Sequence, residues 1–250
     1  MRAGGIALLA ATLASVLPGC GAPDPPRELV VGSHAVRVSI PAGWEVLDQG
    51  RQILIRKASA VLVLQDLGPA GPPGIRREVE RAQDLWRAGR VHEAQWRMKN
   101  VPVPRDLFPT PAHSQAFWAT WSKVSSAPSQ TAYADLELVF AAILAHIDAM
   151  PPRELPTLAD AGLAGLGHDQ RRDVKARRPR TIDGREALDV ESWNRLTHAS
   201  PQRLLFVLND GYLLALRTEP GADRETVKVF EAMLDTLQFA AGRVADGARR

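Results

Sequence analysis

Cysteine is almost absent from this chain of 250 residues, since Cys20 is the only one. A single thiol excludes an intrachain disulfide, and a domain of this size is stable without one because its core is large enough. The charge is also close to balanced, with 31 basic against 28 acidic residues. Nucleic-acid-binding proteins carry a strong basic excess, so we expect no nucleic-acid partner.

Recognisable catalytic and metal-binding motifs are missing as well. The six histidines are scattered, and none belongs to the His-Glu-x-x-His pattern of zinc enzymes. The Gly-x-Ser-x-Gly turn of serine hydrolases and the glycine-rich phosphate loop are absent. No spacing singles out a pair of carboxylates for acid–base chemistry. We therefore expect no catalytic residue, no metal site and no diffusible cofactor.

No apolar run is long enough to cross a bilayer, which takes about 20 residues. The longest uncharged stretch, residues 3–17, follows Arg2 and ends at Pro18 and Gly19. A basic start, a short apolar run and a break at small residues are typical of a secretory signal peptide. The sequence therefore predicts export of the chain, with residues 1–19 as the signal.

The four residues Leu17-Pro18-Gly19-Cys20 resemble the lipobox of bacterial lipoproteins. In that family the signal is cut before the cysteine, whose thiol takes a diacylglycerol and whose new amine is acylated. The resemblance implies that Cys20 is the lipid attachment site, that this covalent lipid is the only bound group, and that residues 20–28 are a lipidated tether. Because Gly21 is not Asp, it also implies the inner leaflet of an outer membrane, facing the periplasm. Secretion with a free thiol and a retained, uncut signal are the alternatives.

The mature chain predicts strands near both of its ends. Residues 36–40 place two valines and an isoleucine between polar neighbours, and the β pattern continues as an antiparallel meander over 29–66. Towards the other end, turns at Asp183-Gly184 and Asn209-Asp210-Gly211 predict two β-hairpins.

Helices are expected between and after these strands, where apolar residues recur at helical spacing. They cover residues 76–90, 131–150, 157–166 and 222–239. In the middle of the chain, Trp96 and Met98 alternate with polar residues, so we expect a strand at 93–99. Residues 116–124 are interpreted as a second strand that pairs back on it.

This order of strands, helices, strands and a final helix predicts an α+β fold. We expect an antiparallel sheet made of the N-terminal meander plus the C-terminal hairpins, covered by helices. A single domain would span residues 29–240, with a helical and tryptophan-rich insertion at about 70–160. Residues 241–250 would be a flexible tail.

Three stretches together resemble the PsbP-like fold, a family that includes photosystem II PsbP proteins and small bacterial lipoproteins of the DcrB type. They are VSIPAGWEV (38–46), TIDGREALDV (181–190), and LLFVLNDGYLLAL (204–216) followed by a helix ending LDTLQF. The resemblance covers the two ends of the chain, whereas residues 70–160 depart from the family pattern. It implies a final hairpin, helix and short strand, and a non-catalytic binding or assembly module.

Residues 171–180 form the one cluster of basic charge. Anionic lipid, phosphate or an acidic partner would suit such a run. The alternative is a solvated strand edge that its charges protect from aggregation, and we favour this second interpretation because the overall charge is nearly balanced. The candidate contact residues are Arg171, Arg172, Lys175, Arg177, Arg178 and Arg180.

Four of the six tryptophans lie between positions 86 and 121. Aromatic faces suit a glycan or peptide ligand, and Trp118 and Trp121 are the candidates to face one. We favour the alternative that the group is core, because tryptophan is usually mostly buried.

Two functions remain open. The first is a membrane-anchored, periplasm-facing lipoprotein that binds or assembles an envelope protein or glycan. The second is an envelope hydrolase, or another enzyme, whose Asp, Glu and His residues come together only in the fold. A convergent titratable cluster in a deep pocket would favour the enzyme.

Overall fold

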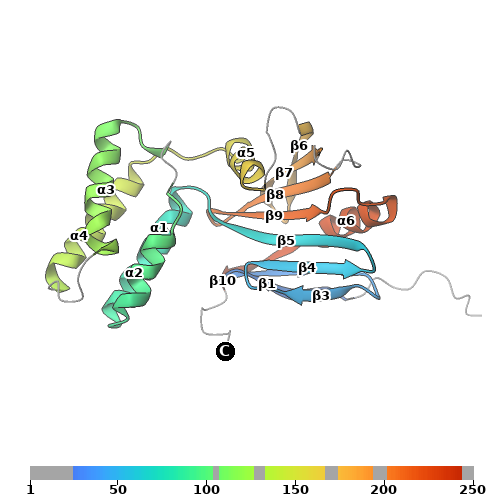
Figure 1. Ribbon diagram of the computed structural model, residues 1–250, viewed down its shortest axis with the longest axis horizontal. Coiled ribbons are helices and arrows are strands. Elements are labelled where there is room, and N and C mark those ends of the chain that lie inside the picture. The colour runs from blue at the N-terminus through green and yellow to red at the C-terminus, as the bar shows by residue number, and fades with distance from the viewer. Residues whose placement is uncertain (1–24, 104–106, 127–132, 167–173, 194–201, 244–250) are drawn as a thin grey trace, which may run out of the picture.

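The computed structural model describes residues 25–103, 107–126, 133–166, 174–193 and 202–243. Figure 1 shows two parts: a helical lobe of α1–α4 at one end, and a sheet region that contains the described strands β1–β10 with α5 and α6. The strands are β1 Arg27–Val31, β2 His34–Val38, β3 Glu45–Asp48, β4 Gln52–Lys57, β5 Ala60–Pro69, β6 Val174–Ile182, β7 Arg185–Ser192, β8 Gln202–Asn209, β9 Tyr212–Thr218 and β10 Gln238–Arg243. The helices are α1 Pro72–Arg87, α2 Val91–Asn100, α3 Pro111–Ser125, α4 Tyr133–Asp148, α5 Leu155–Gly165 and α6 Arg224–Thr236.

The predicted α+β class with an antiparallel sheet is confirmed. The main sheet has seven strands in the order β3-β4-β5-β9-β8-β7-β6, so the pairing of β5 with β9 joins the N-terminal meander to the two C-terminal hairpins. The first two strands form a separate three-stranded sheet with β10. The expected single meander over 29–66 is therefore divided between two sheets.

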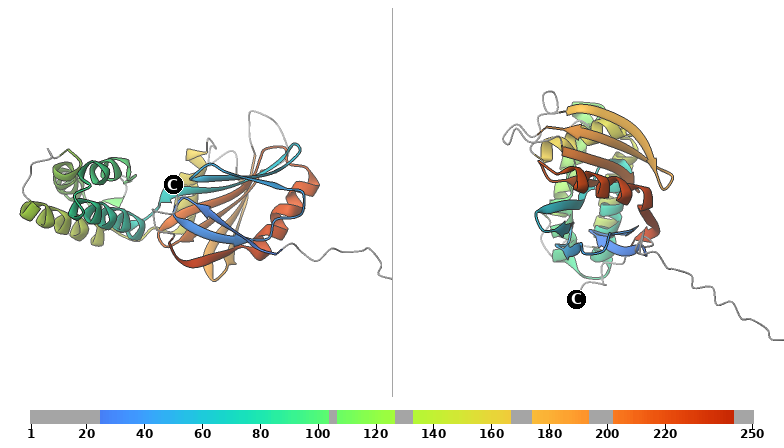
Figure 2. Two further views of the ribbon diagram at one scale, coloured as in Figure 1. Left: turned by 90° about the horizontal axis from the view of Figure 1, so that it is seen from below. Right: turned by 90° about the vertical axis from the view of Figure 1, so that its right-hand side faces the viewer.

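Helices and the small sheet cover the two faces of the main sheet (Figures 1 and 2). On one face, α6 buries Phe230 and Met233 in a core shared with the small sheet. On the other face, α5 buries Leu158 and Leu163 against residues of β8 and β9, including Phe206. Strands β8 and β9 are covered on both sides, which explains why each contains a continuous run of five residues, LLFVL in β8 and YLLAL in β9, that are apolar or aromatic.

The helical lobe has a core of its own, built from α1–α4 and separate from both sheet cores. Two predicted strands are wrong here. Residues 93–99 belong to α2, because Ala94 and Met98, four positions apart, are buried while Trp96 points outwards. Residues 116–124 belong to α3, where Phe117, Trp121 and Val124 are buried at helical spacing.

Three element ends also differ from the sequence-based expectation. The strand β1 begins at Arg27, inside the expected tether. The last helix ends at Thr236, because Leu237 takes an extended conformation with φ −68° and ψ 120°. The strand β10 follows it and runs to Arg243, into the expected tail.

A tight contact between α1 and the β8–β9 turn fixes the helical lobe to the sheet region. A Cβ on Gly74 would lie 2.1 Å from the Gly211 carbonyl oxygen, so neither position has room for a side chain. The Ala70 amide donates to that same oxygen at 2.9 Å, and Arg77 Nη1 donates to the Asp210 carbonyl oxygen at 2.9 Å. These contacts set the direction in which α1 leaves the sheet.

Candidate functional site

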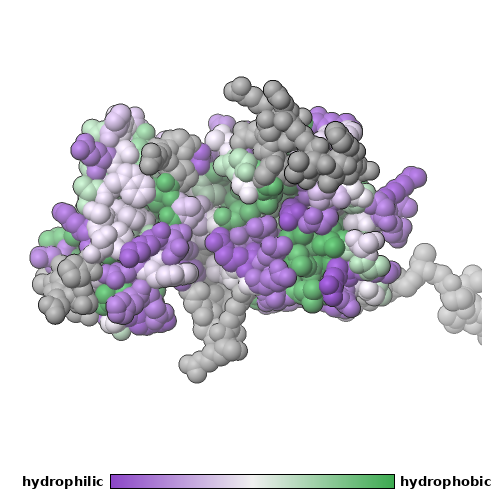
Figure 3. All heavy atoms as spheres, in the orientation of Figure 1, coloured by the Kyte–Doolittle hydropathy of each residue, from purple (hydrophilic) through white to green (hydrophobic). Residues whose placement is uncertain are grey.

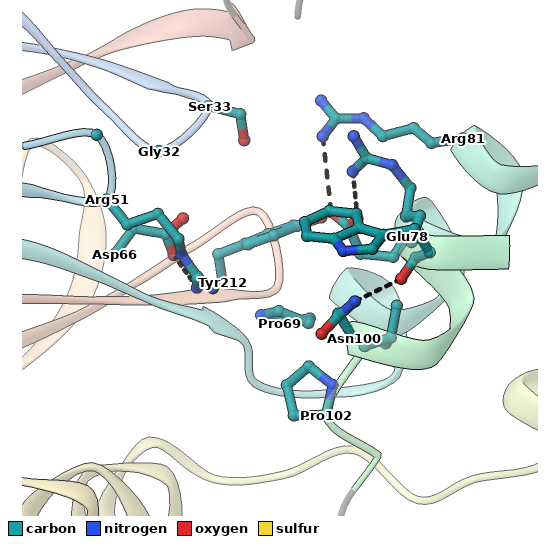
Figure 4. Close-up of a pocket in the computed structure, with 14 residues that line it drawn as sticks. Gly32, Ser33, Arg51, Asp66, Pro69, Glu78, Arg81, Asn100, Pro102 and Tyr212 are labelled. Atoms are coloured by element: carbon teal, nitrogen blue, oxygen red, sulfur yellow. Dashed lines mark hydrogen bonds and ion pairs between the residues drawn. The ribbon is translucent and has the colours of Figure 1, made fainter. Parts of the chain in front are cut away.

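Two adjoining cavities lie where the helical lobe meets the sheet region. Their volumes are about 310 and about 500 Å³, and both are lined by Arg51, Asp66, Pro69 and Pro102. We call them together the junction groove. Figure 4 shows the smaller cavity, with Arg51 and Asp66 on the sheet side facing Glu78 and Arg81 of α1. Figure 3 shows hydrophilic side chains on the surface where the two parts meet.

Glu78 is the buried charge that the helical lobe contributes to this site. Its side chain is 11% exposed and accepts hydrogen bonds from the Tyr212 hydroxyl of β9 and from Arg97 Nη1 of α2, the latter at 2.6 Å. Arg81 Nη1 lies 3.6 Å away. One carboxylate therefore joins α1, α2 and the sheet, and its oxygens are occupied by structural partners.

Asp66 is the buried carboxylate on the sheet side. The Gly68 amide donates to its Oδ1 at 2.7 Å, and Arg51 Nη2 lies 3.5 Å from the same oxygen. Burial raises the pKa of this carboxyl above its ordinary value, with Arg51 and the Gly68 amide opposing the shift and the charge of Glu78 adding to it. A Cβ on Gly32 would lie 2.1 Å from Asp66 Oδ2, so this turn needs glycine both for its φ of +59° and for the close approach.

A buried polar network continues behind Tyr212 into the sheet region. The His34 ring contacts the Tyr212 ring edge-on, with centroids 5.0 Å apart. Asn209 links His34 to Arg185, with Nδ2 3.0 Å from His34 Nδ1 and Oδ1 accepting from Arg185 Nε at 2.7 Å. This network holds Tyr212 in place and with it the inner wall of the groove.

An exposed guanidinium group and an exposed indole line the remainder of the groove. Trp96 of α2 is 67% exposed and contributes to the smaller cavity. Arg51, whose side chain is 61% exposed, lies between the two cavities and lines both. Among the described lining residues, four guanidinium groups, from Arg51, Arg81, Arg97 and Arg153, outnumber the two carboxylates, from Asp66 and Glu78.

The described part of the basic run, residues 174–180, lies on β6, at the edge of the main sheet, and not at the groove. Arg171 and Arg172 lie outside the described residues, as does Cys20. The other four cations all face carboxylates: Lys175 Nζ is 3.1 Å from Glu191, Arg178 is 3.8 Å from it, Arg177 pairs with Asp160, and Arg180 pairs with Glu231 at 3.3 Å. These pairs agree with the charged strand edge that we favoured from the sequence.

The tryptophans divide into core and surface. Trp86 and Trp121 are 3% and 5% exposed and belong to the lobe core, so Trp121 does not face a ligand. Trp118 is 37% exposed and packs edge-on against Phe117 and Phe108. The most exposed indole is Trp96, which we had not singled out.

Sequence patterns gave no direct signal for the groove residues Arg51, Asp66, Glu78 and Trp96. They come from four elements or turns far apart in the chain, and no motif links them. The alternation of Trp96 with polar residues was itself misleading, because it favoured a strand. The one usable signal is Trp96 itself, a tryptophan at a position that a helix over these residues would leave exposed.

Comparison with known proteins gave no relative: no family model, no curated protein and no solved structure matches this chain. Within the described ranges, no group of three or more His, Cys, Asp or Glu side chains is placed to hold a metal ion. Among the helices that the structure describes, none combines the length and apolar character needed to cross a membrane.

Proposed function

We propose that this protein is a membrane-anchored lipoprotein of the cell envelope that acts as a non-catalytic binding or assembly module. Cys20 carries the lipid, residues 20–26 tether the folded part, and the junction groove receives the ligand, an envelope protein or glycan. The observation that carries the proposal is the groove itself. Concave sites lined by apolar walls and a few convergent polar groups, at the boundary between two packed units, are where proteins bind ligands.

The chemistry of the groove favours binding over catalysis. Glu78 is held by Tyr212 and Arg97, and removing it from those partners would leave buried groups unsatisfied. The exposed parts are the Trp96 indole and the Arg51 guanidinium, which are groups that recognise ligands.

One observation supports the alternative of an enzyme. Asp66 has a raised pKa and shares a cavity with a second carboxylate, Glu78, which is an arrangement that acid–base catalysts use. The test is hydrolysis of a panel of chromogenic glycosides and peptides by the full chain and by Asp66→Asn. Turnover that the substitution abolishes would establish the enzyme and contradict the binding proposal.

The anchor is tested with Cys20→Ser expressed in cells fed a fatty-acid analogue. The wild-type chain should be labelled and should sediment with membranes. The variant should lose both the label and the membrane association, because thioether formation needs the thiol. An unlabelled wild-type chain, or a variant that stays fully labelled and membrane-bound, would contradict the lipid anchor.

The ligand site is tested by photocrosslinking in intact cells. A photoreactive residue replaces Ala161, which lines the larger cavity of the groove and is exposed on α5, and in the control chain it replaces Gln115, which is exposed on α3. We expect a discrete adduct from position 161 and none from position 115. Equal adducts from both positions, or no adduct from the groove position, would contradict the assignment of the groove as the ligand site.

A further inference from the structure

The open indole in the groove comes with a fixed carboxamide beside it. Asn100 Nδ2 donates to the Trp96 carbonyl oxygen at 2.6 Å, which holds the amide group of Asn100 one helical turn from the indole. Both residues line the smaller cavity, and Ser33 of the β1–β2 turn lines it from the sheet side (Figure 4). The planar apolar surface of the Trp96 indole is thus surrounded by groups that can donate and accept hydrogen bonds.

Two guanidinium groups in the same cavity keep hydrogen-bonding capacity for a ligand. Arg51 and Arg81 approach their carboxylates only at 3.5 and 3.6 Å, beyond the usual length of a hydrogen bond. Figure 4 shows them on opposite sides of the cavity. A guanidinium binds a carboxylate with two parallel N–H···O bonds, so an anionic group between these side chains would be bound with directional preference.

These features together exclude simpler ligands. A purely apolar molecule would cover the carboxamide, the hydroxyl and the guanidinium groups without giving them partners, which is costly. A neutral polar molecule would not use the charge of the guanidinium groups that Arg51 and Arg81 present to the cavity. A pyranose ring has axial C–H groups that pack on an indole, equatorial hydroxyls that bind amides and hydroxyls, and, in acidic sugars, a carboxylate.

We propose that the junction groove binds a carboxylate-bearing saccharide. The sugar ring packs against Trp96, its carboxylate binds Arg51 and Arg81, and its hydroxyls bind Asn100 and Ser33. The adjoining second cavity, which shares Arg51 and Asp66 with the first, accommodates a following sugar unit, so an oligosaccharide fits better than a single ring. This inference rests on the binding function proposed above and names the class of its ligand.

The experiment measures binding of two matched pairs of sugars by the full chain in detergent, using titration calorimetry. N-acetylmuramic acid is compared with N-acetylglucosamine, and trigalacturonate with its methyl ester, so that each pair differs in a carboxylate charge. We expect each acidic sugar to bind at least about tenfold more tightly than its partner, because hydrogen bonds to a charged group are lost in the neutral one.

The same titration compares a variant of the groove tryptophan with a matched control variant. Trp96→Ala should weaken binding by about tenfold or more, whereas Trp118→Ala, which changes an exposed indole elsewhere in the lobe, should leave it within about twofold. Circular dichroism confirms that both variants are folded.

The outcomes separate this inference from the proposed function. The saccharide inference is overturned by any one of three results. They are equal affinity for acidic and neutral sugars, equal effects of the two tryptophan variants, and no binding of any sugar. If position 161 still crosslinks to a discrete component in cells, such as a peptide, the binding function survives without the saccharide inference. If neither sugar binding nor a groove adduct is found, both proposals fail.

Discussion

The helical lobe and the sheet region are stabilised in different ways. The sheet region buries charge: Asp189 is 2% exposed and is paired with Arg203 at 2.7 Å. Apart from the pairs that Glu78 makes at the junction, the lobe has its ion pairs at the surface, as in Arg87 with Glu137, and fills its interior with apolar and aromatic side chains. A lobe charge is buried at the junction, where Glu78 meets Tyr212. The comparison shows that polar specificity is concentrated in the sheet and at its boundary with the lobe.

The largest expected effect tests whether the two cores are separate. Phe117→Ala in the lobe and Phe206→Ala in the sheet should each cost about 4 kcal/mol, because both rings are fully buried. Hydrogen exchange of the native protein should show Phe117→Ala raising exchange in α1–α4 while β7–β9 stay protected. Equal loss of protection in both regions after Phe117→Ala would show that the cores unfold as one.

A second pair of variants compares buried with exposed charge. Arg203→Met should destabilise the protein by about 3 kcal/mol, since it leaves the Asp189 carboxylate buried without its closest cation. Arg87→Met removes an exposed arginine of the lobe and should have the small effect of a surface substitution. Urea denaturation measures both. A loss from Arg87→Met as large as that from Arg203→Met would break the distinction between the two regions.

The junction is tested by removing one hydroxyl. Tyr212→Phe deletes the hydrogen bond from β9 to the Glu78 carboxylate and should cost about 2 kcal/mol, as expected for a buried bond to a charged group. The variant should also become more sensitive to proteolysis between β5 and α1. Unchanged stability would mean that this contact does not join the lobe to the sheet.

A smaller effect is expected from pH. Because the pKa of Asp66 is higher in the folded protein than in the unfolded chain, the native state binds the proton more tightly. The resulting stability is fully present below about pH 4, the ordinary carboxyl pKa, and is lost as the pH rises through the folded value. Asp66→Asn should therefore gain stability relative to wild type as pH increases through that range. Thermal unfolding across pH measures the stability of Asp66→Asn relative to wild type. If this stability difference stays constant or falls as pH increases, the raised pKa of Asp66 is contradicted.

The sheet and its turns were predictable because their signals are local. The Asp183-Gly184 and Asp210-Gly211 turns have positive φ at both residues, as the sequence pattern of two-residue hairpins requires. The apolar stripes of α1, α4 and α6 also gave the right element types. The failures lie in α2 and α3, where Trp96 and Trp118, respectively, are exposed indoles that disguise the helical period.

The groove was not predictable from the same patterns. It depends on where α1 is placed by the Gly74–Gly211 contact, which is a long-range packing event between residues with no shared motif. The partners of Glu78 lie 19 and 134 residues away in the chain. Only the three-dimensional arrangement brings two buried carboxylates, several arginines and one indole into a single cavity.

The central claim is that the junction holds the lobe in one position and so preserves the groove. The most direct measurement is the distance between spin labels at Ala119 of α3 and Ser59 of the β4–β5 turn, in a Cys20→Ser background, by double electron–electron resonance. We predict one narrow distance distribution that Gly211→Ala broadens, because a side chain there cannot fit against Gly74. A broad distribution in the parent chain, or no change in the variant, would contradict the account.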